Sequence, residues 1–331
     1  IHYFKGQYSL KMLARNWVAI AELPLVYFGL RQDFWATFKQ YREIEKEAPS
    51  TFFFVPFKDR PGMLDNNHNA PSIRAIKYKV EDLRQDIFSL MAEQCEIGVH
   101  GIDSWLKVES AKEEINIIRN LVGLSNLGVR MHWLYFGSES PTILEKAGYV
   151  FDATCGYNEK IGYKAGTAQV YRPFGAKHLL ELPMHIMDTA LFYPNRMNLT
   201  FSEGIKAIKS ILKTAICFGG VLTFNWHDRS LGPERQWDGV YCWLLNELRL
   251  HGARFLTANA MVDWFRKRRA VIFDQVYINT SSSKVKLTRL DMNPADGMIL
   301  RIYSPSKHFP KQQLVYRDVL LGEQREVTIF L

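Results

Sequence analysis

The chain has 331 residues, of which 47% are hydrophobic and 23% are charged. This composition is typical of a folded globular protein, and it excludes collagen-like, low-complexity and wholly disordered chains. The formal net charge is +8, but no run of basic residues is interleaved with aromatic ones, so we expect no nucleic-acid binding. The length favours one large α/β domain with a small appendage over several small modules.

Residues 1–32 are predicted to form a helical lead-in. Their most apolar stretch, Trp17 to Leu30, contains Glu22 and Pro24 and lacks the roughly 18 uninterrupted apolar residues of a membrane span. We therefore expect no membrane span, and the pattern of a cleaved signal peptide is also missing. Because the sequence starts at Ile1 instead of Met, we expect it to begin inside a longer gene product.

Residues 33–269 alternate short β-forming runs with longer segments of helical periodicity. This alternation is typical of a βα-repeating fold with a parallel sheet. The predicted strands, in chain order, are Thr51–Pro56, Glu96–His100, Val129–Phe136, Tyr149–Thr154, Leu180–Met184, Gly220–Trp226 and Ala253–Leu256. Helices are predicted at Glu203–Phe218, Trp237–Leu250 and Ala258–Arg268.

Two segments between these elements are predicted loops, Pro61–Ser72 and Gly156–Lys177. Loops as long as the second are often functional in compact domains. Residues 270–331 consist of short alternating runs separated by turn residues. They predict a small C-terminal all-β appendage, which we expect to be incomplete.

Ionisable residues recur where the predicted strands end, and in parallel βα folds these ends share one face. They are His100, Arg130, His132, Asp152, His185, His227 and Asp228. A single histidine at such a place is more often a hydrogen-bonded core residue, and Asp152 or Asp228 could cap the next element. Their recurrence nevertheless suits metal-assisted hydrolysis, since imidazole and carboxylate bind Zn²⁺ and a further histidine transfers protons.

Five motifs, in chain order, carry a resemblance to a known family. They are TFFF at Thr51–Phe54, EIGVH with GIDS at Glu96–Ser104, RMHW at Arg130–Trp133, the strand end at Asp152, and TFNWHD at Thr223–Asp228. In this order they resemble the motifs of the polysaccharide deacetylases of the NodB-homology type, carbohydrate esterase family 4. The resemblance covers roughly Asp33 to Arg269 and implies a distorted (β/α) barrel of the polysaccharide deacetylase type.

The resemblance implies hydrolysis of an N- or O-acetyl group on a carbohydrate substrate, with a divalent metal, most simply Zn²⁺. His100 would bind the metal. Asp103 is a candidate second ligand, because the family's second metal-binding histidine falls at Ser104. His227 would protonate the leaving group.

The remaining candidates have supporting roles in this scheme. Arg130 would orient a catalytic base, while Asp152 and Asp228 would fix the orientation of imidazole rings. Trp133 would form a wall of the acetyl pocket. His132, which replaces the family's usual Pro, and His185 are candidate substrate contacts.

The family's Asp motif on the first strand has no match upstream of Thr51, and we expect it before Ile1. This departure and Ser104 keep two alternatives open. The chain could be a degenerate barrel that binds glycans without catalysis. It could also be a different hydrolase on the same fold, since a fold alone does not fix the chemistry.

Overall fold

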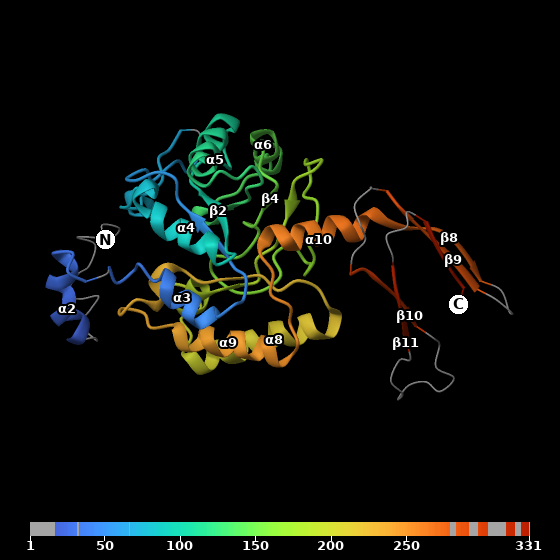
Figure 1. The fold of residues 1–331 in the computed structure, drawn as a ribbon. Coiled ribbons are helices and arrows are strands. Elements are labelled where there is room, and N and C mark those ends of the chain that lie inside the picture. Colours follow the sequence, from blue (N-terminus) through green and yellow to red (C-terminus); the bar gives the residue numbers. More distant parts are fainter. Residues whose placement is uncertain are drawn as a thin grey trace. The chain divides into compact units, whose positions relative to one another are not determined.

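The computed structural model describes residues 17–31, 33–65, 67–278, 283–290, 297–303, 316–321 and 326–330. The chain divides into two compact units, Ile1–Met261 and Val262–Leu331 (Figure 1). Most of the predicted lead-in, residues 1–16 and 32, lies outside the described residues.

In the first unit, helices and strands alternate along the chain. The helices are α2 (Trp17–Tyr27), α3 (Phe38–Glu45), α4 (Arg84–Ala92), α5 (Val108–Val122), α6 (Ser140–Ala147), α7 (Asp188–Phe192), α8 (Phe201–Phe218), α9 (Asp238–Leu250) and α10 (Ala258–Ala270), which continues into the second unit. The strands are β1 (Thr51–Phe54), β2 (Glu96–Gly101), β3 (Val129–Met131), β4 (Phe151–Asp152), β5 (Leu180–Glu181), β6 (Ile186–Met187) and β7 (Phe224–Asn225).

The strands of the first unit form two parallel sheets. The larger sheet has the order β1-β2-β3-β4-β5, and β6 pairs with β7 in a separate sheet. Consecutive parallel strands with helices between them are the βα arrangement predicted from the sequence. The α/β class with a parallel sheet is therefore confirmed, whereas the described strands do not close into one barrel.

Each sheet is covered by its own group of helices. Apolar side chains of α4, α5 and α6 pack with those of β2 and β3 in one core, which includes Ile87, Ile97, Ile115, Leu144 and Val129. A second core joins α8 and α9 to β6, through Ile186, Ile208, Leu212, Val240 and Leu244. The amphipathic periodicity of these helices thus buries one face of each against a sheet.

One glycine makes the packing of the larger sheet possible. A Cβ atom at Gly128 would lie 2.0 Å from the ring of Phe151, which is closer than atoms can approach. The ring is fully buried against the chain just before β3. Gly128 therefore permits the close approach that brings β4 beside β3.

The observed elements differ from the predicted ones mainly at the strand ends. The strand predicted at Val129–Phe136 stops at Met131, because Trp133 and Leu134 have left-handed φ angles of 62° and 55°. Residues 253–256 form no strand, and the Ala253 N–H donates instead to the carbonyl of Leu248 in α9. The three predicted helices all exist, as α8, α9 and α10.

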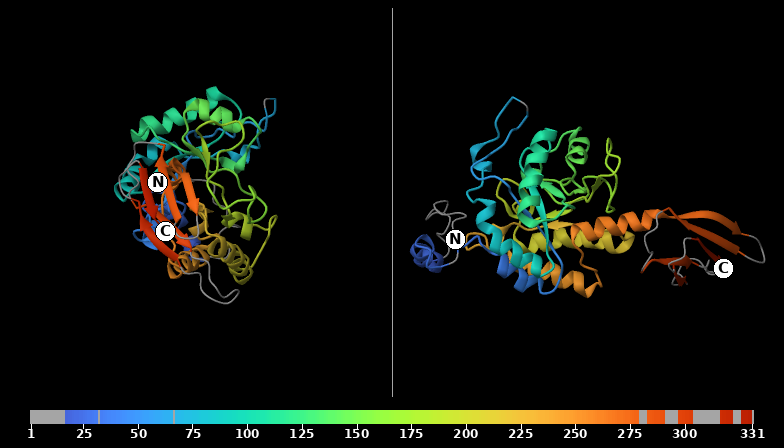
Figure 2. Two further views of the ribbon diagram at one scale, coloured as in Figure 1. Left: turned by 90° about the vertical axis from the view of Figure 1, so that its right-hand side faces the viewer. Right: turned by 45° about the horizontal axis from the view of Figure 1, so that its top comes forward.

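The second unit contains short antiparallel strands (Figure 2). They are β8 (Val271–Ile278), β9 (Ser283–Arg289), β10 (Ile299–Tyr303), β11 (Tyr316–Leu320) and β12 (Glu326–Phe330), in the sheets β12-β9-β8 and β10-β11. Val285, Leu287, Met298 and Leu321 form a small core in it. In neither unit does the described part of the chain hold a helix both long and apolar enough to cross a bilayer.

Candidate functional site

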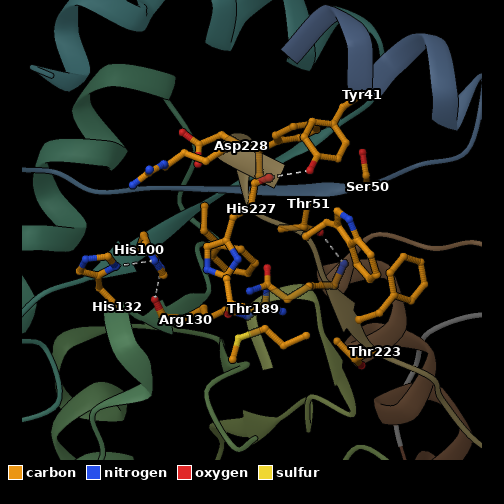
Figure 3. Close-up of a pocket in the computed structure, with 18 of the residues that line it drawn as sticks. Tyr41, Ser50, Thr51, His100, Arg130, His132, Thr189, Thr223, His227 and Asp228 are labelled. Carbon is orange, nitrogen blue, oxygen red and sulfur yellow. Dashed lines mark hydrogen bonds between the residues drawn. The ribbon is translucent and has the colours of Figure 1, made fainter. Parts of the chain in front are cut away.

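A cavity of about 1220 Å³ lies in the first unit (Figure 3). It is lined by both β1 and β7, the end strands of the two parallel sheets. Six of the nine candidate residues also line it, namely His100, Arg130, His132, Trp133, His227 and Asp228. Asp103, Asp152 and His185 are not among its lining residues.

His227 is held by a buried carboxylate that the sequence analysis did not select. Its Nδ1 lies 2.7 Å from Oδ1 of Asp188, and its backbone N–H donates to Oδ2 over 2.6 Å. The Ser230 hydroxyl also donates to Oδ2. Asp188 is fully buried, whereas a third of the His227 side chain is exposed. The carboxylate thus places the proton of the neutral ring on Nδ1. Nε2 is then able to exchange a proton with a ligand in the cavity.

The charge on Asp188 is stabilised inside the protein. Burial alone raises the pKa of a carboxyl, but the charge of His227 and the hydrogen bonds from His227 and Ser230 outweigh it. The pKa of Asp188 is consequently below its ordinary value. We call this arrangement the His227–Asp188 dyad.

His100 and His132 form a second arrangement, which we call the histidine pair (Figure 3). Nε2 of His100 lies 3.0 Å from Nδ1 of His132, and the rings meet at an angle of 73°. The other nitrogen of each ring faces a backbone carbonyl. His100 Nδ1 lies 2.8 Å from the Arg130 oxygen, and His132 Nε2 lies 2.9 Å from the Arg74 oxygen.

Both rings of the histidine pair favour the neutral form. Burial, followed by the charge of His132, lowers the pKa of His100 well below its ordinary value. Burial and the charge of Arg74 lower the pKa of His132 to about 3. The surroundings of the pair therefore oppose protonation of either ring.

The resemblance implies zinc, and the donor set tests whether these residues suit it. A metal-ligating histidine usually gives its second N–H to a carbonyl or a carboxylate, as both members of the pair do. Within the described ranges, however, no group of three His, Cys, Asp or Glu side chains could hold a metal. The described side chains therefore fall short of the three protein ligands that usually hold a catalytic zinc ion.

Arg130 connects the two sheets beneath the cavity. Its Nε donates to the Ala153 oxygen over 3.1 Å, and one terminal nitrogen donates to Oδ1 of Asn225 in β7 over 2.9 Å. Its guanidinium also lies 4.6 Å from the centre of the Phe53 ring. Burial lowers the pKa of Arg130 to about 10, so the side chain stays charged. The residue therefore fixes a positive charge at the base of the cavity.

Asp152 lies behind Arg130 and does not contact an imidazole. Its Oδ1 accepts from the backbone N–H of Thr154 over 3.0 Å, and it forms a buried acid pair with Glu181. Burial raises the pKa of Asp152 to about 6. The structure thus places Asp152 in a buried network under the site, where it compensates part of the charge of Arg130.

Asp228 and Asp103 take part in local structure. Asp228 begins a 3-10 helix, Asp228–Leu231, and burial raises its pKa. The carboxylate bonded to the His227 ring belongs to Asp188 instead. Oδ1 of Asp103 accepts from the Met63 N–H over 2.8 Å and so ties down the loop at residues 61–72.

His185 lies outside the cavity as well. Its Nδ1 accepts from the Thr223 N–H over 3.1 Å, and its Nε2 lies 3.3 Å from the Thr167 oxygen. The ring also stacks near Tyr163, with the centroids 4.9 Å apart. His185 therefore joins the long loop at residues 156–177 to the start of β7.

Trp133 lies at the exposed edge of the site, with 38% of its surface accessible. Its carbonyl accepts from Nδ2 of Asn158 over 2.7 Å. Its left-handed φ angle is unfavourable for a large side chain, since only Gly adopts this region without strain. A large aromatic face is therefore held at the cavity by a strained turn.

The sequence analysis missed two residues of the site, and only one of them, Asp188, carries a signal in the sequence. Asp188 follows β6 directly, so the rule that polar residues mark strand ends applies to it. The strand predicted at Leu180–Met184 ends directly before His185, so the strand-end rule selects His185 and not Asp188. Arg74 is almost fully buried, and its guanidinium donates to the carbonyls of Pro61, Ile102 and His132.

Comparisons with known proteins give a likeness of fold. No family profile matches the chain, and no curated protein matches it in sequence. The crystal structure of a protein named as a polysaccharide deacetylase from Mycobacterium smegmatis is 16% identical, with a TM-score of 0.50 over 75% of this chain and 87% of that one. One so named from Pseudomonas aeruginosa PAO1 is 13% identical, with a TM-score of 0.46 over 66% of this chain and 92% of that one.

Proposed function

We propose that the chain is a hydrolase that removes acetyl groups from the amino or hydroxyl groups of a polysaccharide. The observation that carries the proposal is the His227–Asp188 dyad beside a cavity of about 1220 Å³. A carboxylate-bound imidazole at a cavity is suited to proton transfer during hydrolysis. The fold likeness to the Mycobacterium smegmatis protein supports acetylated polysaccharide as the substrate class.

In the proposed reaction, His227 supplies the proton that the leaving group needs. Nε2 of His227 takes a proton from water as the hydroxyl adds to the acetyl carbon. The imidazolium then gives this proton to the departing nitrogen or oxygen as the carbon–nitrogen or carbon–oxygen bond breaks. Asp188 stabilises the imidazolium form, because its carboxylate is charged and bonded to Nδ1.

Other residues of the cavity would position the substrate. Arg130 places a fixed positive charge near the base of the cavity, where it favours a developing oxyanion. The face of Trp133 is suited to packing on a sugar ring.

The test is acetate release from acetylated glycans by the full-length protein. We expect the His227→Ala variant to lose on the order of 10²- to 10⁴-fold in kcat, which is the usual contribution of a general acid or base. His251→Ala is the matched control, since His251 is exposed at the end of α9.

Two outcomes would contradict the proposal. Acetate release by His227→Ala at the wild-type rate would remove His227 as the proton donor. Glycan binding by the wild-type protein without any acetate release would favour the non-catalytic alternative.

A further inference from the structure

The cavity is lined by more basic than acidic side chains. Among the described residues that line it, Glu45 and Asp228 are the acidic ones, whereas seven are arginine or lysine. Some of these cations have a carboxylate of their own, as Arg229 does with Glu234, whose Oε1 lies 3.2 Å from its Nε. The remaining excess of positive charge favours a ligand that carries negative charge.

Two arginines of the lining, Arg196 and Arg235, contact one aromatic ring, and we call them the arginine pair. Their guanidinium carbons lie 5.3 Å and 4.9 Å from the centre of the Tyr193 ring. Neither forms an ion pair with a carboxylate of the described residues, and Asp188 and Glu159 act on Arg196 only through space. Burial, together with the charge of Arg235, lowers the pKa of Arg196. The two positive charges are therefore incompletely compensated within the protein.

The arginine pair also has hydrogen-bond donors to spare. Arg196 donates to Oγ1 of Thr189 over 2.7 Å. Arg235 donates to the Tyr193 hydroxyl, and another of its nitrogens lies 3.4 Å from Oγ of Ser230. A guanidinium carries five N–H donors, so in the described structure most of those of the pair are left for a ligand of the cavity.

Aromatic packing holds the arginine pair in place. The rings of Tyr193 and Trp237 meet at 70° with their centroids 5.8 Å apart, and the Arg235 guanidinium lies 5.0 Å from the centre of the Trp237 ring. A stacked guanidinium loses less freedom when it binds a ligand. Its planar set of N–H groups matches the paired oxygens of an anionic group such as a carboxylate or a sulfate.

The arginine pair lies beside the His227–Asp188 dyad. Arg196 is bonded to the residue that follows Asp188, and Arg235 approaches the Ser230 hydroxyl, which donates to Asp188. Both oxygens of the Asp188 carboxylate already accept hydrogen bonds from other groups. An anion that binds the pair must therefore come from the ligand, close to the group on which the dyad acts.

We propose that Arg196 and Arg235 bind an anionic group of the substrate, a carboxylate or a sulfate on a sugar near the acetylated one. The substrate class is then an acidic polysaccharide. This assignment rests on the proposed function for the ligand being a glycan, and it deepens that function by adding the charge. A neutral glycan would displace water from two guanidinium groups without replacing its hydrogen bonds in kind.

The experiment compares three oligosaccharides of equal length by calorimetry with the full-length protein. N-acetylchitohexaose is neutral, its O-sulfated derivative carries sulfate, and a hyaluronan hexasaccharide carries carboxylates beside N-acetylglucosamine. We expect at least one anionic probe to bind about 10-fold or more tightly than the neutral one, the usual gain from a charge-assisted hydrogen bond. The probe that binds more tightly identifies the anionic group as carboxylate or sulfate.

A double variant tests the arginine pair itself. Arg196→Gln combined with Arg235→Gln should remove the preference for the anionic probe and leave the affinity for N-acetylchitohexaose unchanged, which also shows that the variant is folded. The matched control is Lys206→Gln combined with Lys213→Gln, because both lysines are exposed on α8 and the net charge changes equally. This control should keep the preference of the wild type.

Modification of the wild-type protein by phenylglyoxal, which reacts with arginine, tests the same contacts without any substitution. Peptide mapping should show that the anionic probe protects Arg196 and Arg235, whereas N-acetylchitohexaose does not.

The inference is overturned if the three oligosaccharides bind equally, if the double arginine variant keeps the preference, or if the lysine control loses as much of it. A preference for an anionic probe without acetate release would contradict the proposed function alone. Acetate release with equal affinity for neutral and anionic glycans would contradict this inference alone.

Discussion

The His227–Asp188 dyad and the histidine pair use the same side chain in opposite ways. In the dyad a buried carboxylate bonds to Nδ1 of His227. In the pair the bonded groups are neutral carbonyls, and burial depresses the pKa of both rings. Both arrangements border one cavity, so the partner of each imidazole, and not its exposure alone, separates their chemistry.

The difference shows how one site can hold a proton donor and lone-pair donors side by side. A carboxylate partner stabilises the imidazolium form, which can release a proton to a leaving group. Carbonyl partners fix the neutral tautomer and leave the second nitrogen as a ligand. Loss of the carboxylate partner should therefore remove the function of His227 as a proton donor.

The largest effect is expected from Asp188→Asn. An amide cannot stabilise the imidazolium and can present the wrong tautomer, so kcat for acetate release should fall on the order of 10³- to 10⁴-fold, as in catalytic triads. Asp228→Asn is the comparison variant, and an equal loss there would show that Asp188 is not the effective partner of His227.

The same variant should change the pH dependence of stability. The pKa of Asp188 is below its ordinary value of 3.8, so the folded state binds this proton less tightly than the unfolded state. The resulting stability is present above pH 3.8 and is lost as the pH falls through the folded pKa. Asp188→Asn should therefore lower the free energy of unfolding by about 3 kcal/mol at pH 6 and by less at pH 3.

Denaturant unfolding at the two pH values measures this difference. If the cost of Asp188→Asn is the same at both, the carboxylate charge of the dyad does not contribute to stability.

Ser104→His tests whether an imidazole at position 104, where the resembled family has its second metal-binding histidine, can reach the site. The larger side chain has no space in a completely buried position, and it breaks the bond to Glu114. We expect it to lower the free energy of unfolding by about 2 kcal/mol without increasing zinc affinity. Tighter zinc binding in this variant would indicate that the site near Ser104 is open to a ligand.

The smallest effect is expected from Trp133→Gly at the edge of the cavity. Glycine removes the strain of the left-handed φ angle but also frees the unfolded chain, so stability should change by less than about 1 kcal/mol. Glycan affinity should fall. An unchanged glycan affinity would show that the Trp133 ring does not contact the glycan.

The sequence predicted the long elements better than the short ones. β1 and β2 are apolar runs with clear ends, and α8 begins with a capping box between Thr200 and Glu203. β6 consists of two residues at the end of the segment from Leu180 to Met187, in which Glu181, Pro183 and His185 interrupt the apolar residues. The composition of this segment does not indicate where strand pairing stops after β5 and resumes at β6. Asp188 was therefore not recognised as a residue at a strand end.

The site was predictable as a set of strand ends but not as a set of contacts. The rule of strand ends found His100, His132 and His227, which line the cavity. Their partners depend on the register of β2 with β3 and on the turn at Trp133, which bring together residues far apart in sequence. The buried bond between Ser104 and Glu114 is likewise a tertiary contact that no local pattern reports.

The contacts of Arg74 make the loop at residues 61–72 and the histidine pair one cooperative unit. The guanidinium donates to carbonyls of the loop, of β2's end and of His132, while the Arg74 oxygen accepts from the His132 ring. Local opening of the loop must then release His132 as well, because both depend on the same side chain. A ligand that immobilises the ring would accordingly slow amide exchange and proteolytic cleavage in a loop that it never touches.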